Sequence, residues 1–147
     1  MMDYRNAFAI SASGMAVEKI RLDTTAANLA NMNTTRGVDG KPFQPLTVKV
    51  VASQASFAAG FERQIGAAGL HGARVLQIEP ANVPPRRLYD PGNPDADSKG
   101  FVALPGVNQV TEMVNMAGAL RAYEANVVAM NAAKTMALKA LELGGGQ

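Results

Sequence analysis

The residue types that most often carry chemistry are scarce in this sequence. Its 147 residues include no cysteine and one histidine, which excludes disulfides, thiolate catalysis and cysteine-ligated zinc within one chain. The histidine, His71, stands between Leu70 and Gly72, and the first carboxylate after it is Glu79. Because a catalytic histidine needs a partner that orients it, we interpret His71 as a loop residue. We expect no catalytic residue and no enzyme activity.

The segment Asp95-Ala96-Asp97-Ser98-Lys99-Gly100 has part of the spacing of a calcium-binding loop. However, its third ligand position is Lys99, and its twelfth position is Gly106 where a bidentate glutamate is required. A cation would meet a positive charge there. We therefore predict no metal site and no cofactor, and we expect these carboxylates to accept backbone N–H bonds in turns.

Phosphate and nucleic-acid binding are also disfavoured. A phosphate-binding loop around Gly40-Lys41 would need a glycine where Thr35 stands and a serine or threonine where Pro42 stands. The basic pair Arg86-Arg87 has no interleaved aromatic residues, and the net charge is only +2. We expect neither nucleic acid nor a small-molecule substrate as a partner.

The composition favours a protein that buries much of its surface against other chains. Charged residues make up 18% of the sequence, against about 25% in a typical soluble domain. Aromatic residues make up 5% and hydrophobic residues 48%. No apolar stretch is long enough for a membrane span. The N-terminus carries Asp3 and lacks the positive segment of a cleaved signal peptide, so we expect none.

Residues 3 to about 33 are predicted to form a helix. Apolar residues recur at every seventh position, at Phe8, Met15, Leu22 and Leu29. This spacing places them on one helical face, with Lys19 as the interruption. Asp3 is expected to cap the start of the helix, and Asn31, Asn33 and Gly37 are expected to mark its end.

Residues 108 to 143 are predicted to form a longer helix, about 54 Å in length. Side chains step by three and four over four heptads, at Met113, Met116, Leu120, Tyr123, Val127, Met130, Ala137 and Leu141, with Lys134 completing the frame between Met130 and Ala137. Asn108 is expected to cap its start, and Gly144 to end it.

The same helix carries a second apolar stripe. It consists of Val110, Val114, Val128, Met136 and Leu138. One partner helix covers only one stripe, and exposed apolar area costs roughly 25 cal/mol per Å². The second stripe therefore favours contact with other chains. The alternative is a compact helical bundle in which this stripe is internal.

The middle of the chain is predicted to be rich in strands and turns. Leu46 to Val50 alternates apolar and polar residues, as a half-buried strand does, and Val75 to Ile78 is a second candidate strand. Residues 53–69 are rich in alanine, serine and glycine, and we expect a mobile loop there. Pro84-Pro85 and the run from Asp90 to Pro94 are incompatible with a helix or a central strand, which predicts an ordered, turn-rich extension.

Together these elements predict an α+β fold. It is an antiparallel coiled coil of long N- and C-terminal helices with a small β-rich, turn-rich middle extension. Residues 1–36 would hold the N-terminal helix, 37–106 the extension and 107–147 the C-terminal helix. Five asparagines lie on the two helices or at their ends: Asn28, Asn31, Asn115, Asn126 and Asn131. These asparagines are either solvated or capping residues, or they form hydrogen bonds across the helices that fix the register of the helix pair. The sequence leaves both possibilities open.

Several segments resemble bacterial flagellar rod and hook proteins. Thr24 to Thr34, which reads TTAANLANMNT, is similar to the N-terminal signature of that family. Tyr89 to Val102 resembles a segment of its proximal rod members. The likeness continues through 105–115, 121–127 and 134–144. Little of it falls within residues 45–80.

The resemblance implies a structural subunit of the proximal rod, the drive shaft of the flagellar basal body. Its helices would pack around the export channel and transmit torque. It also implies a periplasmic location and export by the flagellar type III apparatus without a cleaved signal. Its partners would be copies of itself, other rod proteins and the export-gate junction protein FliE.

The residues that we expect at the assembly interface lie on the two predicted helices. They are Phe8, Met15, Leu22, Leu29, Asn28, Asn31, Met113, Met116, Leu120, Tyr123, Val127, Met130 and Leu141. The competing hypothesis is a soluble coiled-coil adaptor or secretion chaperone that binds a client helix in a methionine-rich groove.

Overall fold

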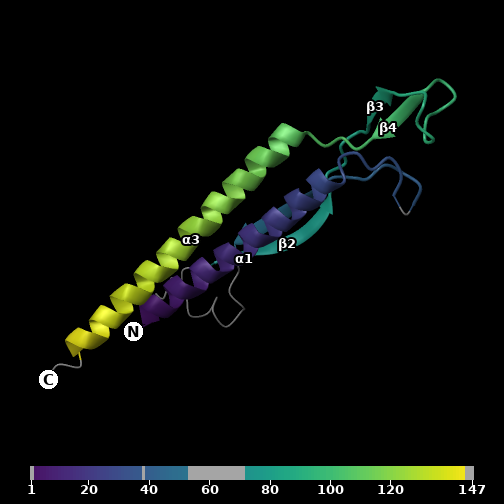
Figure 1. Ribbon diagram of the computed structural model, residues 1–147. Coiled ribbons are helices and arrows are strands. Elements are labelled where there is room, and N and C mark those ends of the chain that lie inside the picture. Colours follow the sequence, from purple (N-terminus) through teal and green to yellow (C-terminus); the bar gives the residue numbers. More distant parts are fainter. Residues whose placement is uncertain (1, 38, 53–71, 145–147) are drawn as a thin grey trace. The chain divides into compact units, whose positions relative to one another are not determined.

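A computed structural model of the chain describes residues 2–37, 39–52 and 72–144. Its elements, in order, are α1 (Met2–Ala30), β1 (Leu46–Ala52), β2 (Ala73–Pro80), β3 (Arg86–Tyr89), β4 (Phe101–Leu104) and α3 (Gln109–Gly144) (Figure 1). Long helices at the two ends with strands between them confirm the predicted α+β class. The loop expected at 53–69 and His71 lie outside the described residues.

The chain forms two compact units. The first comprises Met1–Ile20, Val50–Leu76 and Ala119–Gln147, and the second Arg21–Lys49 and Gln77–Gly118. Each unit contains part of α1 and part of α3. The contacts described below all lie within one unit or the other.

The end of α1 is explained by Asn31, the residue directly after the helix. The Asn31 side chain donates from Nδ2 to the Ala27 carbonyl at 2.9 Å, and Thr34 N donates to the Asn31 carbonyl at 3.0 Å. These local bonds close the last turn and start the loop. The helix stops at Ala30, three residues before the predicted end. The prediction that Asp3 is the N-cap is wrong, because the helix begins at Met2 and already includes Asp3.

The start of α3 confirms the predicted cap. Asn108 Oδ1 accepts a hydrogen bond from Thr111 N at 3.1 Å, and the Asn108 carbonyl accepts one from Glu112 N at 3.0 Å. This is the N-cap arrangement that satisfies an otherwise unpaired amide. Glu112 in the first turn adds a negative charge where the helix dipole favours one. The described part of the helix runs for 36 residues, from Gln109 to Gly144, and the residues after it lie outside the described part of the chain.

The buried positions of α1 and α3 are small or polar. They are Ser11, Val17, Thr24, Thr25 and Asn28 in α1, and Ala119 and Ala133 in α3. The large apolar residues of α1 that recur every seventh position, Phe8, Met15, Leu22 and Leu29, are only half-buried. The inner helix faces of each unit are therefore built from residues that a search for large apolar side chains overlooks.

One close helix contact lies in each unit. In the first unit, a Cβ placed on Gly14 would lie 2.8 Å from Nδ2 of Asn126. In the second, Asn28 Nδ2 lies 3.1 Å from Glu112 Oε2. In each unit, therefore, a residue of α1 lies close to a residue of α3.

The strands form two small sheets. β1 pairs with β2 in one of them, and β3 pairs with β4 in the other. β1 and β2 confirm the two predicted strands, and each is longer than predicted. The β3–β4 pair is antiparallel, with Arg86 opposite Leu104 and Tyr89 opposite Phe101. These two strands were not predicted, although the prolines that flank β3 do lie outside strands as expected.

One side of β4 is buried, whereas all four residues of β3 are exposed. Val102 and Leu104 of β4 are buried, and Phe101 and Ala103 between them are exposed. Pro105, directly after the strand, is also fully buried. This alternation follows from the two-residue period of a strand, and it leaves the Phe101 side of the hairpin open.

Candidate functional site

The described residues offer no arrangement that suggests catalysis or metal binding. Among them, no three histidine, cysteine, aspartate or glutamate side chains gather closely enough to hold a metal ion. None of the described helices is long and apolar enough to cross a membrane. The candidate sites are therefore surfaces and junctions, and three of them stand out.

The first is a junction centred on Asn28 in the second unit. The side chain is 2% exposed. Its Nδ2 donates to the Leu46 carbonyl at 2.9 Å and to Glu112 Oε2 at 3.1 Å, and its Oδ1 accepts from Leu46 N at 2.8 Å. One buried amide thus joins α1 to the start of β1 and to α3. Of the two roles that the sequence left open for Asn28, the structure shows the bond between elements.

A pocket of about 410 Å³ lies beside this junction. Its lining includes Thr24, Thr25 and Asn28 from α1, and Thr111, Glu112 and Asn115 from α3. The facing helix surfaces are thus polar here, and their pairing depends on hydrogen bonds as well as on apolar contact.

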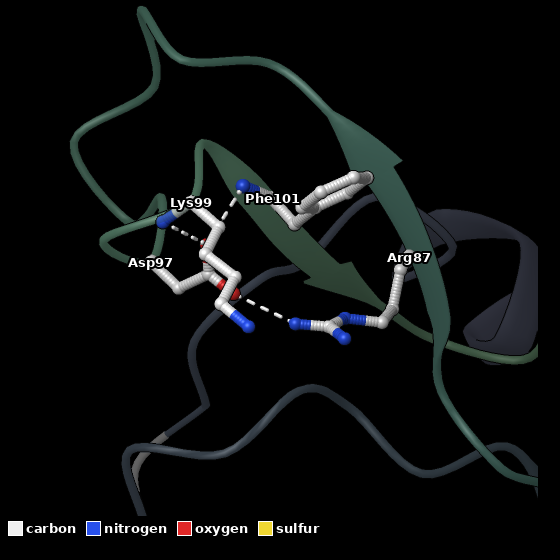
Figure 2. Close-up of polar contacts among 4 residues, drawn as sticks. All are labelled: Arg87, Asp97, Lys99 and Phe101. Atoms are coloured by element: carbon white, nitrogen blue, oxygen red, sulfur yellow. Dashed lines mark hydrogen bonds and ion pairs between the residues drawn. The ribbon is translucent and has the colours of Figure 1, made fainter.

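The second candidate is the hairpin, whose loop is organised by Asp97 (Figure 2). Asp97 Oδ1 accepts hydrogen bonds from Lys99 N at 2.8 Å and Phe101 N at 2.9 Å, and Oδ2 accepts one from the Arg87 guanidinium at 2.7 Å. The bond from the Phe101 amide, followed by those from Lys99 and Arg87, lowers the pKa of Asp97 against the opposing effect of desolvation. The expectation that this carboxylate serves backbone N–H groups in a turn is confirmed.

Two aromatic rings and a cation stack beside Asp97. The Tyr89 and Phe101 rings meet edge to face with centroids 5.3 Å apart, and the Arg87 guanidinium carbon lies 5.3 Å from the Phe101 ring centre. Gly100 makes this possible. It has a φ of +79°, which a glycine adopts without strain, and a Cβ there would lie 2.9 Å from Tyr89 Cε2.

Asp95 attaches the same loop to the segment after α1. Its Oδ2 accepts a hydrogen bond from Thr35 Oγ1 at 2.6 Å, and its Oδ1 forms an ion pair with Arg36 at 3.3 Å. Arg86 of β3 adds a long bond to Asn33 Oδ1 at 3.5 Å. Unlike Asp97, this carboxylate is therefore bound by side-chain donors from a distant part of the sequence.

The third candidate is the apolar surface of α3. Met113, Leu120 and Leu141 of the predicted interface are exposed, with Leu120 at 48%. Met116, Tyr123, Val127 and Met130 are half-buried. Every residue of the second stripe is exposed, namely Val110, Val114, Val128, Met136 and Leu138. Each unit thus contains part of α3 with large apolar side chains that are exposed among the described residues.

Comparison with known proteins identifies the family. Residues 8–36 match the family described as "Flagella basal body rod protein", and residues 98–143 match "Flagellar basal body rod FlgEFG protein C-terminal". The flagellar basal-body rod protein FlgC of Escherichia coli O6:H1 is 40% identical over 139 residues, which cover 95% of this chain and 96% of the relative. The chain belongs to the FlgC family.

Relatives in other bacteria also cover most of the chain. FlgC of Bacillus subtilis strain 168 is 38% identical over 92% of this chain and 94% of its own length. FlgC of Aquifex aeolicus is 40% identical over 91% of this chain and 92% of its own length. Membership of the FlgC family makes the chain a structural protein of the flagellar basal-body rod. The hypothesis of a soluble adaptor or secretion chaperone is not favoured.

Sequence reasoning missed several residues of these sites. Gly14 and Thr35 gave no signal, since neither is part of a periodic apolar pattern or a known motif, and Tyr89 was noted only as the first residue of the segment that resembles rod proteins. Asp95 and Asp97 were both expected to accept backbone N–H bonds in turns, which is confirmed for Asp97 and wrong for Asp95, whose carboxylate binds Thr35 and Arg36. The spacing of polar residues around a glycine, as in Asp97 to Gly100, is a sequence signal of a tight loop.

Proposed function

We propose that this chain is a subunit of the proximal rod, in which its helices pack around the export channel and transmit torque. The observation that carries the proposal is the uncovered apolar surface of α3. Val110, Val114, Val128 and Leu143 are each more than half exposed. Covering such side chains stabilises an assembly by about 25 cal/mol per Å² of apolar area.

Torque transmission needs interfaces that resist shear. Packed side chains deform little, because protein interiors are as dense as organic crystals. A continuous row of apolar residues from neighbouring helices would supply such an interface. The role that we propose is mechanical, and it requires no enzyme activity.

We assign the assembly surface to residues of the two helices. They are Phe8, Met15, Leu22, Leu29, Asn28, Asn31, Met113, Met116, Leu120, Tyr123, Val127, Met130 and Leu141. In the proposed organisation, residues 1–36 and 107–147 supply the helical layer, and residues 37–106 form an extension on the outside. Asn28 and Asn31 would contribute to the assembly surface indirectly, because their hydrogen bonds fix the position of the end of α1.

The proposed partners are copies of the same chain, other rod proteins, the junction protein FliE and the flagellar type III export apparatus. The proposed location is the periplasmic part of the basal body, reached without a cleaved signal. These assignments are supported by the FlgC family relationship and by the composition, which is low in charge. Nucleic acid and small-molecule substrates have no place in this function.

Substitution of Leu120 tests the proposal. Leu120 is 48% exposed in the single chain, so Leu120→Asp should leave the helix content of the purified protein unchanged while it blocks packing between chains. In a strain that lacks its own copy, we expect Leu120→Asp to abolish swimming and rod formation. Leu120→Met, which keeps an apolar side chain of similar volume, should swim normally. Normal swimming of the aspartate variant would refute the assignment.

A further inference from the structure

The open side of the β3–β4 hairpin is built as a contact surface. Tyr89 and Phe101 are opposite each other in the strand register, so their rings lie on the same side, and Arg87 lies on that side too. Tyr89 is 64% exposed. Tyrosine and arginine, with other aromatic residues, are the types that contribute most to binding at protein interfaces. We call Arg87, Tyr89, Lys99 and Phe101 the hairpin face.

The hairpin face is held in shape before any partner binds. Asp97 fixes the Arg87 guanidinium and the backbone amides of Lys99 and Phe101. The Phe101 ring is in contact with Tyr89 on one side and Arg87 on another. Side chains that are already ordered lose less conformational entropy on binding. This geometry therefore favours a surface for recognition over an ordinary exposed loop.

The charge of the face is positive. Figure 2 shows the Lys99 side chain running along the side of the loop on which the Arg87 guanidinium lies. Among the residues that the structure describes, Lys99 Nζ has no ion pair and no hydrogen bond. The Asp97 side chain is 38% exposed against 65% for Arg87. One carboxylate, already bonded, thus faces two cations.

We propose that the hairpin face docks an acidic segment of a neighbouring rod-family protein. A carboxylate of the partner would accept hydrogen bonds from Lys99 Nζ and from the guanidinium N–H groups that Asp97 does not use. Arginine has five N–H donors, so it can serve both carboxylates. An adjacent apolar side chain of the partner would pack on the Tyr89 and Phe101 rings.

The proposal rests on the proposed function, because it takes the partner to be a neighbour in the rod. It concerns a different surface from the α3 residues, and it predicts the chemistry of the contact. Complementary charge at such an interface steers encounter and sets the register of the partners.

Photo-crosslinking in intact cells tests the proposal. Tyr89 is replaced by the photoreactive residue p-benzoylphenylalanine in the full chain, the cells are irradiated, and the cross-linked peptide is sequenced. We expect a peptide from a protein, with aspartate or glutamate within a few residues of the cross-link. Lys99→Glu should reduce the yield about tenfold, as expected when an attractive charge pair becomes repulsive. Replacing the partner acid by lysine should restore the yield in the Lys99→Glu chain.

Lys99→Glu is preferable to a change at Arg87, because the Lys99 ammonium group takes no part in holding the hairpin together. Lys139→Glu on α3 is the matched control, since Lys139 is also an exposed lysine but belongs to another element, and it should leave the yield unchanged. A cross-link to lipid or glycan, no cross-link, or a yield that Lys99→Glu leaves intact would overturn the proposal. If Leu120→Asp cells swim while the acidic cross-link persists, the docking surface stands and the assembly assignment falls.

Discussion

Asn28 and Leu46 are joined as two paired strand residues would be. Leu46 N donates to Asn28 Oδ1 at 2.8 Å, and Asn28 Nδ2 donates to the Leu46 carbonyl at 2.9 Å. The side-chain amide replaces the backbone of a neighbouring strand, at the first residue of β1. Its second N–H binds Glu112 at 3.1 Å. Both donors and the oxygen are therefore used, which explains how an asparagine that is 2% exposed is tolerated.

Removing this amide should be costly. Asn28→Ala leaves the N–H and carbonyl of Leu46, which is half-buried, without these partners. We expect a loss of about 1–3 kcal/mol in the free energy of unfolding. Urea denaturation followed by circular dichroism measures it. Asn28→Asp should cost at least as much, because a carboxylate has no donor for the Leu46 carbonyl and would lie beside Glu112.

Asn6→Ala is the control for this prediction, because Asn6 is exposed on the same helix. It should change the free energy of unfolding by less than about 0.5 kcal/mol. Equal stability of the Asn28→Ala and Asn6→Ala chains would show that the junction contributes nothing.

The contact between Gly14 and Asn126 gives a second prediction. A Cβ at Gly14 would lie 2.8–2.9 Å from three atoms of the Asn126 side chain, and that side chain is held by a bond from Nδ2 to the Ala122 carbonyl at 2.9 Å. Gly14→Ala should therefore destabilise the protein by about 1–2 kcal/mol. In an Asn126→Ala chain the same change should stabilise it by up to about 1 kcal/mol, because alanine is the better helix former.

Gly118→Ala provides the comparison on α3. A Cβ at Gly118 meets nothing within 4 Å, so the substitution should be stabilising by up to about 1 kcal/mol. Thermal unfolding of Gly14→Ala, of Gly14→Ala in the Asn126→Ala chain and of Gly118→Ala separates the effect of helix propensity from that of the steric clash. If Gly14→Ala and Gly118→Ala stabilise the protein alike, Gly14 and Asn126 do not make this close contact.

The helices were predictable because their signals are local and repeated. The heptad steps of α3 extend over its whole length, and Asn108 caps it through groups only three and four residues away. β1 and β2 were found from the alternation of apolar and polar residues. β3 and β4 have four residues each, and β3 begins with two arginines, so no alternation could be recognised.

The sites were less predictable because their partners are distant in the sequence. Asn28 is 84 residues from Glu112, and Thr35 is 60 residues from Asp95. A polar residue that will be buried looks the same in sequence as one that will be solvated. Whether such a residue is buried depends on which donors and acceptors the fold brings close to it. The composition of the sequence does not contain this information.

Asp97 gives the hairpin a predictable response to pH. Its pKa lies below the ordinary value of 3.8, chiefly because the Phe101 amide donates to the ionised carboxylate. A carboxylate with a lowered pKa contributes stability that is complete above its unfolded value and is lost as the pH falls through the folded value. The hairpin should therefore be unchanged from pH 8 to about pH 4 and should open in stronger acid.

Nuclear magnetic resonance of the Lys99 and Phe101 amides measures this transition. Both signals should move together as the pH falls below about 4. In an Asp97→Asn chain the acid transition of these two amides should be absent. Amides that shift equally in both chains would mean that another group controls the loop.

The attachment between Thr35 and Asp95 gives the last prediction. The bond from Thr35 Oγ1 to Asp95 Oδ2 is short, at 2.6 Å, and its acceptor also pairs with Arg36. Thr35→Val removes the hydroxyl and keeps the shape, so we expect a loss of about 1 kcal/mol and faster amide exchange in the loop from Asn93 to Asp97. Thr35→Ser keeps the hydroxyl and should exchange like the parent. The valine variant lacks the hydroxyl that the serine variant keeps, and it has two methyl groups that serine lacks. Equal exchange in both would remove Thr35 from the attachment and leave the Arg36 ion pair to hold Asp95.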